Sequence, residues 1–421
     1  MLRKIVFTIL CLVVATAYAQ NSSVSPYSYH GIGDIRAQST VENQAMGGLG
    51  MYTDSIHTNL QNPAAYGKLR LVNYTAAGGH AEVTLTDYTG TEQTSVTSLQ
   101  YLALGIPITP KMGIGFGVLP YTSVGYNVFA DNVTAVQDTV VNQFGGEGGL
   151  NKVFLSAGYE ITKSFHIGAT VNYSFGSLEY RTVQNIAGVQ YGVINSKQSQ
   201  IKGFDFNYAA TYTPRIMGRY TLFTSLMVNT QANLTSQNEE SLGSFSTITG
   251  EEIEGRDIDL EALDLKNTEL KIPTITTLGL GFGRDKKWFL GAEYSLQGLS
   301  SFRNEFVDQS NITYKDASTI AIGGYIIPDY ASFTSYAKRV NYRFGARYEN
   351  TGMVINAKEI KDYGITFGLG LPLGAGFDNI NLGFMYGIRG TATANLVEES
   401  YFKVNIGLSF NDKWFQKRKI N

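Results

Sequence analysis

Long segments in which apolar residues alternate with polar residues or glycine recur along this chain, and they constrain its fold more than any other feature. The last segment spans residues 402–410. Its apolar positions are Phe402, Val404, Ile406, Leu408 and Phe410, and Lys403, Asn405, Gly407 and Ser409 lie between them. Side chains point alternately to the two faces of a β-strand, so this segment predicts a strand with one apolar face and one polar or bare face.

The same alternation returns in many places. It is clear at 165–175, 204–212, 278–283, 340–347, 363–371 and 380–389. The longer runs have about 9–11 residues, the length that a tilted strand needs to cross hydrocarbon, whereas strands in soluble sheets average about 5–6. With 46 Gly, 27 Tyr, 23 Phe and only 16% charged residues, the chain is predicted to be all-β. Because lipid tolerates no open sheet edge, we expect a transmembrane antiparallel β-barrel.

The connections between these segments alternate between short turns and long polar stretches. Residues 129–149, 184–200, 234–271 and 300–316 are expected to be long outer loops, and the short turns are expected to face the periplasm. Counting the crossings predicts about fourteen strands, with the barrel spanning residues 69–411. An even number places both chain ends in the periplasm.

The first nineteen residues have the pattern of a signal peptide. Arg3 and Lys4 precede a short apolar run, and Ala17-Tyr18-Ala19 is a suitable cleavage site. Cys11, the only cysteine, lies in that run, so the exported chain would hold no disulfide, thiol nucleophile or cysteine metal site. We therefore expect export to the outer membrane, with its lipid as a partner.

The two ends of the exported chain differ from the barrel segments. Residues 20–68 show no alternation and are rich in Gly, Ser, Asn and Gln, so they form either a disordered leader or a plug inside the barrel. Residues 412–421 form a basic, aromatic tail expected in the periplasm. Trp414, Phe415, Lys417 and Arg418 are its candidate docking residues.

Two motifs resemble a known family. The first is similar to the N-terminal hatch of the FadL-like transporters of long-chain fatty acids and aromatic hydrocarbons. It consists of Ala45-Met46-Gly47-Gly48-Leu49-Gly50, then Asp54, then Asn59-Leu60-Gln61-Asn62-Pro63-Ala64-Ala65. Residues 112–120 look like the third strand of that family. The resemblance implies a fourteen-stranded barrel with an internal plug. The chain departs from the family at Ala65-Tyr66, where Gly-Leu is usual, and in its tail.

The resemblance also implies two positions at which the protein would open. Movement at Asn62, Pro63 and Ala64 would open the lumen, the alternative being a static turn capped by the asparagine. A kink at Leu119, Pro120 and Tyr121 would open the barrel wall sideways. The alternative is that Pro120 merely ends its strand.

Four cations are expected to point into the lumen: Arg343, Arg347, Arg389 and Lys403. They could bind an anionic headgroup of a hydrophobic ligand. Alternatively, they pair with acids of the plug or loops, such as Glu42, Asp54 or Glu398.

Several classes of function find no support in the sequence. Lys and Arg number 33 against 35 Asp and Glu, which gives no reason to expect nucleic acid. No catalytic motif is present, and the four histidines share no metal spacing. The acidic stretch 251–269 lacks the glycine and distal glutamate of a calcium loop. We therefore expect no enzyme, cofactor or metal site.

Two functions stay open. The first is passive uptake of hydrophobic small molecules through a plugged channel. The second is a non-transporting barrel subunit of a larger outer-membrane assembly or secretion complex.

Overall fold

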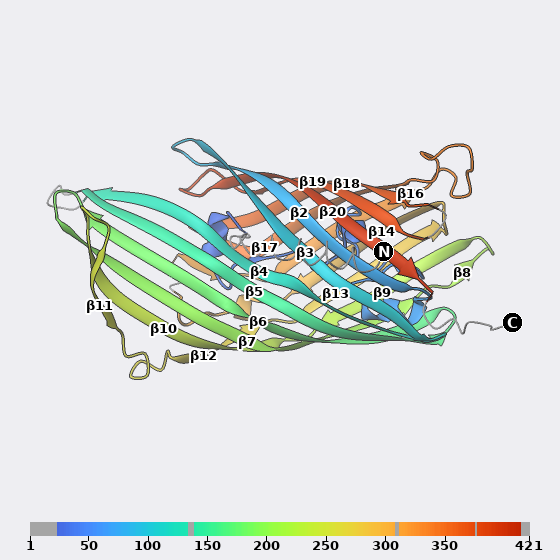
Figure 1. Ribbon diagram of the computed structural model, residues 1–421, viewed down its shortest axis with the longest axis horizontal. Helices are drawn as coiled ribbons and strands as arrows, with labels where there is room; N and C mark the ends of the chain where they lie inside the picture. Colours follow the sequence, from blue (N-terminus) through green and yellow to red (C-terminus); the bar gives the residue numbers. More distant parts are fainter. Residues whose placement is uncertain (1–22, 134–138, 308–310, 375–376, 414–421) are drawn as a thin grey trace.

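A computed structural model describes residues 23–133, 139–307, 311–374 and 377–413. In it the chain forms a closed antiparallel β-barrel of fourteen crossings (Figure 1), so the predicted fold class and strand number are confirmed. The barrel closes where the first wall strand pairs with the last, from Val72 opposite Asp412 to Thr86 opposite Glu398. The helices of the described residues are short, and none has the length and apolarity needed to cross a membrane.

The wall consists of β2 (Val72–Thr86), β3 (Thr91–Thr109), β4 (Met112–Val133), β5 (Thr139–Thr162), β6 (Phe165–Ile186), β7 (Tyr191–Tyr212), β9 (Tyr220–Asn229), β10 (Ala232–Ser246), β12 (Asn267–Ile272), β13 (Ile275–Arg284), β14 (Trp288–Gln297), β16 (Ala317–Ile326), β17 (Asn341–Ile355), β18 (Lys358–Pro372), β19 (Asn379–Gly390) and β20 (Glu398–Asp412). The smaller elements are η2 (Pro26–Tyr29), β1 (Asp34–Ile35), α2 (Val41–Gln44), η3 (Pro63–Lys68), β8 (Arg215–Ile216), β11 (Glu252–Asp257), η4 (Leu299–Ser301) and β15 (Ile312–Tyr314).

Two crossings are each built from two strands. β9 and β10 both pair with β7 and together make one crossing. β12 and β13 make the next, because β12 pairs with β10 and β13 pairs with β9.

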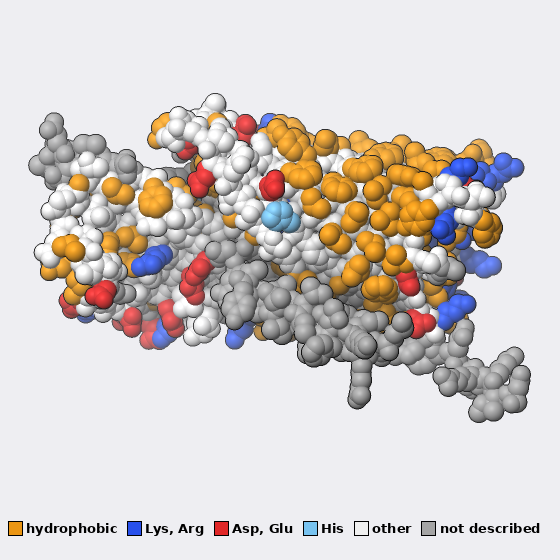
Figure 2. Space-filling view, turned by 45° about the horizontal axis from the view of Figure 1, so that its top comes forward, with side chains coloured by type: hydrophobic (Ala, Val, Ile, Leu, Met, Phe, Trp, Pro, Cys, Tyr) orange, Lys and Arg blue, Asp and Glu red, His pale blue; other side chains and the backbone are white. Residues whose placement is uncertain are grey.

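The alternating pattern assigns the two faces of the wall. On β7, Phe204, Phe206 and Tyr208 are exposed on the outside, while Asp205 and Asn207 are buried on the inside. Such outward residues form the broad apolar band visible in Figure 2. The lipid-facing surface therefore follows directly from the sequence pattern.

The prediction of long outer loops was largely wrong. Residues 129–149 and 184–200 belong mostly to strands that continue far past the apolar band, and most of 234–271 forms β10, β11 and β12. Only 300–316 is mainly irregular, with η4 and β15 as its regular parts. Beyond the lipid both faces of a strand meet water, so backbone pairing continues without the apolar alternation that identifies a strand in the sequence.

Candidate functional site

Residues 23–71, which we call the N-terminal segment, lie against the inward face of the wall. α2 contacts β18, β19 and β20, and η3 contacts β3 to β7. A Cβ atom added at Gly345 of β17 would lie 2.2 Å from the backbone N of Gly47. A glycine in the wall is thus required for this close approach of the segment.

Asn62, Pro63 and Ala64 form a capped turn that is fully buried. Oδ1 of Asn62 accepts a hydrogen bond from N–H of Ala64 at 3.1 Å, which caps η3. Oδ1 of Asn59 accepts one from N–H of Asn62 at 3.0 Å, and Asn207 of β7 donates to the carbonyl of Gln61 at 2.7 Å. The sequence motif therefore ties η3 both to its own loop and to the wall.

The wall is split between β3 and β4. Within the described residues, these strands pair only from Leu102 opposite Val118 to Thr109 opposite Met112. Past Leu102 and Val118 the two strands no longer pair with each other. There β3 pairs with β2, and β4 pairs with β5. A β-bulge between Pro120 and Thr122 lies at this point. Pro120 thus does not end its strand, and Leu119, Pro120 and Tyr121 stand where the wall opens.

β1 of the N-terminal segment occupies the split. Asp34 pairs with Ser123 of β4, and Ile35 pairs with Thr122. N–H of Arg36 donates to the carbonyl of Tyr121 at 2.9 Å. The Arg36 guanidinium reaches across to donate to Oγ of Ser98 on β3. Residues 33–38, which we call the strap, therefore bridge the two edges of the split.

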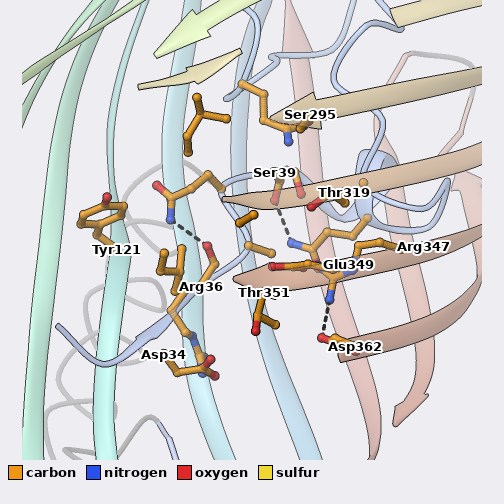
Figure 3. A pocket seen from close by; sticks show the side chains of 18 of the residues that line it. Asp34, Arg36, Ser39, Tyr121, Ser295, Thr319, Arg347, Glu349, Thr351 and Asp362 are labelled. Carbon is orange, nitrogen blue, oxygen red and sulfur yellow. Dashed lines mark hydrogen bonds and ion pairs between the residues drawn. The ribbon is translucent and has the colours of Figure 1, made fainter. Parts of the chain in front are cut away.

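An ion pair fixes the strap to β19, the third strand from β3 around the barrel. Oδ1 of Asp34 lies 2.6 Å from Nη1 of Arg389 on β19. Close by, the Ser25 hydroxyl donates to the carboxylate of Glu399 on β20. Figure 3 shows Asp34 and Arg36 facing the cavity that this part of the lumen encloses.

The other three predicted lumen cations also have protein neighbours. Arg347 lies 2.9 Å from Asp362 and 3.5 Å from Glu349, and the first pair is drawn in Figure 3. Nζ of Lys403 lies 4.3 Å from the centre of the Tyr401 ring.

Arg343 reaches the N-terminal segment through an amide. It donates to Oδ1 of Asn381 at 2.8 Å, and Asn381 donates to Glu42 at 2.7 Å. Of the acids expected as partners, Glu42 is thus linked indirectly. Asp54 binds His57 instead, at 2.6 Å.

A buried ion pair that the sequence pattern did not reveal lies at the level where the split begins. Nζ of Lys152 on β5 is 3.0 Å from Asp205 on β7, and Asn172 donates to the same carboxylate at 2.6 Å. Nζ of Lys152 also lies 3.8 Å from the centre of the Tyr121 ring. The alternation over 204–212 predicts that Asp205 points inward, but only the fold shows that Lys152 is its partner.

The described residues enclose an inner and an outer cavity within the barrel. The inner one, of about 520 Å³, is lined by the strap, Lys152, Asp205, Arg347 and Lys403 among others. The second, of about 1130 Å³, lies among the long outer strands. Its acidic lining residues are Glu92, Glu147, Glu179, Glu239, Glu240, Asp257, Asp259 and Glu261, against Arg181, Lys197 and Lys266. The inner cavity is thus crossed by paired charges, and the outer one is acidic.

The candidate docking residues Trp414, Phe415, Lys417 and Arg418 lie outside the described residues, which end at Lys413.

A family model described as BamG matches residues 1–421, the whole chain. No curated protein matches the chain.

Among solved structures, the toluene transporter TodX of P. putida aligns with a TM-score of 0.62 at 14% identity, over 90% of this chain and all of that one. A Pseudomonas aeruginosa FadL homologue aligns with a TM-score of 0.58 at 12% identity, over 91% of this chain and 100% of that one. The monoaromatic hydrocarbon channel CymD aligns with a TM-score of 0.58 at 12% identity, over 90% of this chain and 99% of that one. At this identity the likeness concerns the fold, and it confirms the FadL-like architecture.

Proposed function

This chain belongs to the BamG family, and we propose from this that it is a non-transporting barrel subunit of a larger outer-membrane assembly. The family model covers the whole chain, whereas the hydrocarbon channels resemble it in fold at 12–14% identity. The observation that carries the proposal is the strap. It fills the split between β3 and β4, and the ion pair of Asp34 with Arg389 holds it there.

The interior supports the same conclusion. An apolar ligand in the inner cavity would lie beside Lys152, Asp205, Arg347 and Asp362, whose charges already neutralise one another. An anionic headgroup bound at Lys152 or Arg347 would have to displace the carboxylate of Asp205 or Asp362. That would leave a buried charge without a partner at a cost of several kcal/mol. With the strap in the split and most of its buried charges paired, the barrel would act through its outer surfaces.

A second candidate function is passive uptake of hydrophobic small molecules. The FadL-like fold and the inner cavity of about 520 Å³ favour it. In that case the strap would have to leave the split to let cargo pass into the bilayer.

Purification in a mild detergent with a tag on the full chain separates the two functions. We expect the chain to elute in a stoichiometric complex with other outer-membrane proteins. We also expect cells that lack the gene to take up toluene and long-chain fatty acids at the normal rate. Elution of the chain alone, together with lost uptake that returns on complementation, would support the transporter instead.

A further inference from the structure

One connection at the short-turn end of the barrel is unlike the others. The β16–β17 connection spans residues 327–340, whereas β3–β4, β5–β6 and β13–β14 are joined by two or three residues. Figure 1 shows it standing out past the end of the barrel beside β16. Short turns and chain ends mark the periplasmic face of such barrels, so this loop is expected to project into the periplasm.

The loop is held in a defined shape. N–H of Asp329 donates to the carbonyl of Lys338 at 2.8 Å, and the Tyr336 hydroxyl donates to the carbonyl of Pro372 at 3.2 Å. Its base is fixed where N–H of Ile327 donates to the carbonyl of Lys287 at 2.7 Å. The side chains at its tip are therefore presented in a fixed position.

Large apolar side chains are presented there to solvent. Phe333 is fully exposed (103%), and Met217 in the β8–β9 turn is 86% exposed. Met217 also has a positive φ of 51°, which costs a non-glycine residue free energy. Such exposure is typical of residues that a partner covers.

These features form one surface, made of residues 213–219, 284–287 and 327–340, which we call the periplasmic patch. Nζ of Lys286 lies 4.6 Å from the centre of the Tyr330 ring, and Arg215 lies 3.9 Å from Asp285. The three connections are therefore in contact with one another.

The patch is strongly basic. It holds seven cations, Arg215, Arg219, Arg284, Lys286, Lys287, Lys338 and Arg339, against Asp285 and Asp329. Figure 2 shows Lys and Arg gathered at this end of the molecule and acids toward the other. A surface with this charge attracts an acidic partner and repels a second copy of itself.

We propose that the periplasmic patch docks an acidic face of a protein partner in the periplasm, with Phe333 and Met217 entering apolar pockets of that partner. The inference rests on the proposed function as a complex subunit. Phe333 and Met217 stand on connections beyond the strand ends, whereas outward-facing residues of the strands, such as Tyr294 and Ile326, meet the lipid. This placement favours a protein over lipid headgroups.

A photo-crosslinking amino acid tests the proposal in cells that contain the full chain and its natural partners. It replaces Phe333 or Met217, with Tyr191 at the opposite end as the control position. We expect both patch positions to crosslink to one and the same periplasmic domain, and Tyr191 not to do so. Lys286→Glu together with Lys287→Glu should reduce that crosslink at least fivefold. The control variant Lys358→Glu, at the outer end, should leave it unchanged.

Other outcomes would overturn the inference. Crosslinks only to lipid, or only to a second copy of the chain, would do so, as would crosslinks that ignore the charge reversal. A complex that purifies intact without any crosslink from Phe333 or Met217 would overturn the patch while leaving the proposed function standing. A chain that purifies alone and crosslinks nowhere would overturn both.

Discussion

Asp34 in the N-terminal segment and Arg389 on β19 form an ion pair with 2.6 Å between Oδ1 and Nη1, although 355 positions separate them in the chain. Because Asp34 also pairs with Ser123 of β4, this contact joins the strap and the β4 edge of the split to β19. Loss of the ion pair should therefore be detected as movement of the strap.

Asp34→Asn is expected to loosen the strap without unfolding the barrel. A hydrogen bond to a charged group contributes about 1.5–3 kcal/mol, which corresponds to an increase on the order of 10- to 100-fold in the open population. A cysteine in place of Ser123 can measure this opening, because Ser123 is fully buried opposite Asp34 of the strap and the only natural cysteine lies at position 11. Maleimide should label that cysteine faster in the Asp34→Asn background, and Glu359→Gln, which removes an exposed ion pair with Lys315, should have no effect. Equal labelling rates in all backgrounds would contradict the role of Asp34.

The buried pair of Lys152 and Asp205 gives a prediction about stability. Lys152→Ala leaves the carboxylate of Asp205 buried without its cation, and we expect a loss of about 3–5 kcal/mol in the free energy of unfolding. Replacing both residues, Lys152→Met with Asp205→Leu, removes both charges and should restore most of that stability. Urea unfolding in lipid vesicles, followed by gel mobility with and without heating, measures both variants. A double variant as unstable as the single one would show that shape rather than charge governs the site.

The two predictions show where sequence reasoning succeeds and where it stops. Alternation around Phe204 and Phe206 places Asp205 inside the barrel, because the period of a strand is two. It cannot show that Lys152, on another strand, is the partner. The split between β3 and β4 has only one trace in the sequence, Pro120, because backbone pairing depends little on residue type. The strap was missed altogether, since its strand β1 has only two residues, too few to carry a periodic pattern.

Asp54 and His57 in the N-terminal segment predict a dependence on pH. Burial alone would lower the pKa of His57, but the Asp54 carboxylate 2.6 Å away outweighs it and raises that pKa above 6.5. Burial alone would raise the pKa of Asp54. The charge of His57 and hydrogen bonds from N–H of Ile56 and His57 outweigh it, and they lower that pKa below 3.8.

The directions of the two pKa shifts define the pH range in which this pair stabilises the fold. The contribution of His57 to the free energy of unfolding is complete below pH 6.5, and it is lost as pH rises through the raised pKa of His57. That of Asp54 is complete above pH 3.8 and is lost as pH falls through its lowered pKa. The stability difference between the natural chain and His57→Gln should therefore be largest between these two values. It is measured by unfolding both at pH 5.0 and pH 8.5, and a difference that grows toward pH 8.5 would contradict the assignment.

Gly33 and Gly48 offer a matched test of how closely the strap approaches the wall. Their φ angles are nearly equal, +93° and +91°, so alanine meets the same backbone strain at either position. Their surroundings differ. A Cβ atom at Gly33 would lie 2.6 Å from the carbonyl oxygen of Ser123, whereas nothing lies within 4 Å of one at Gly48. Both variants should thus lose on the order of 1–2 kcal/mol from the backbone. Only Gly33→Ala should also push the strap out of the split and speed labelling of a cysteine in place of the buried Ser123. Equal labelling in the two variants would mean that the strap does not rest against β4.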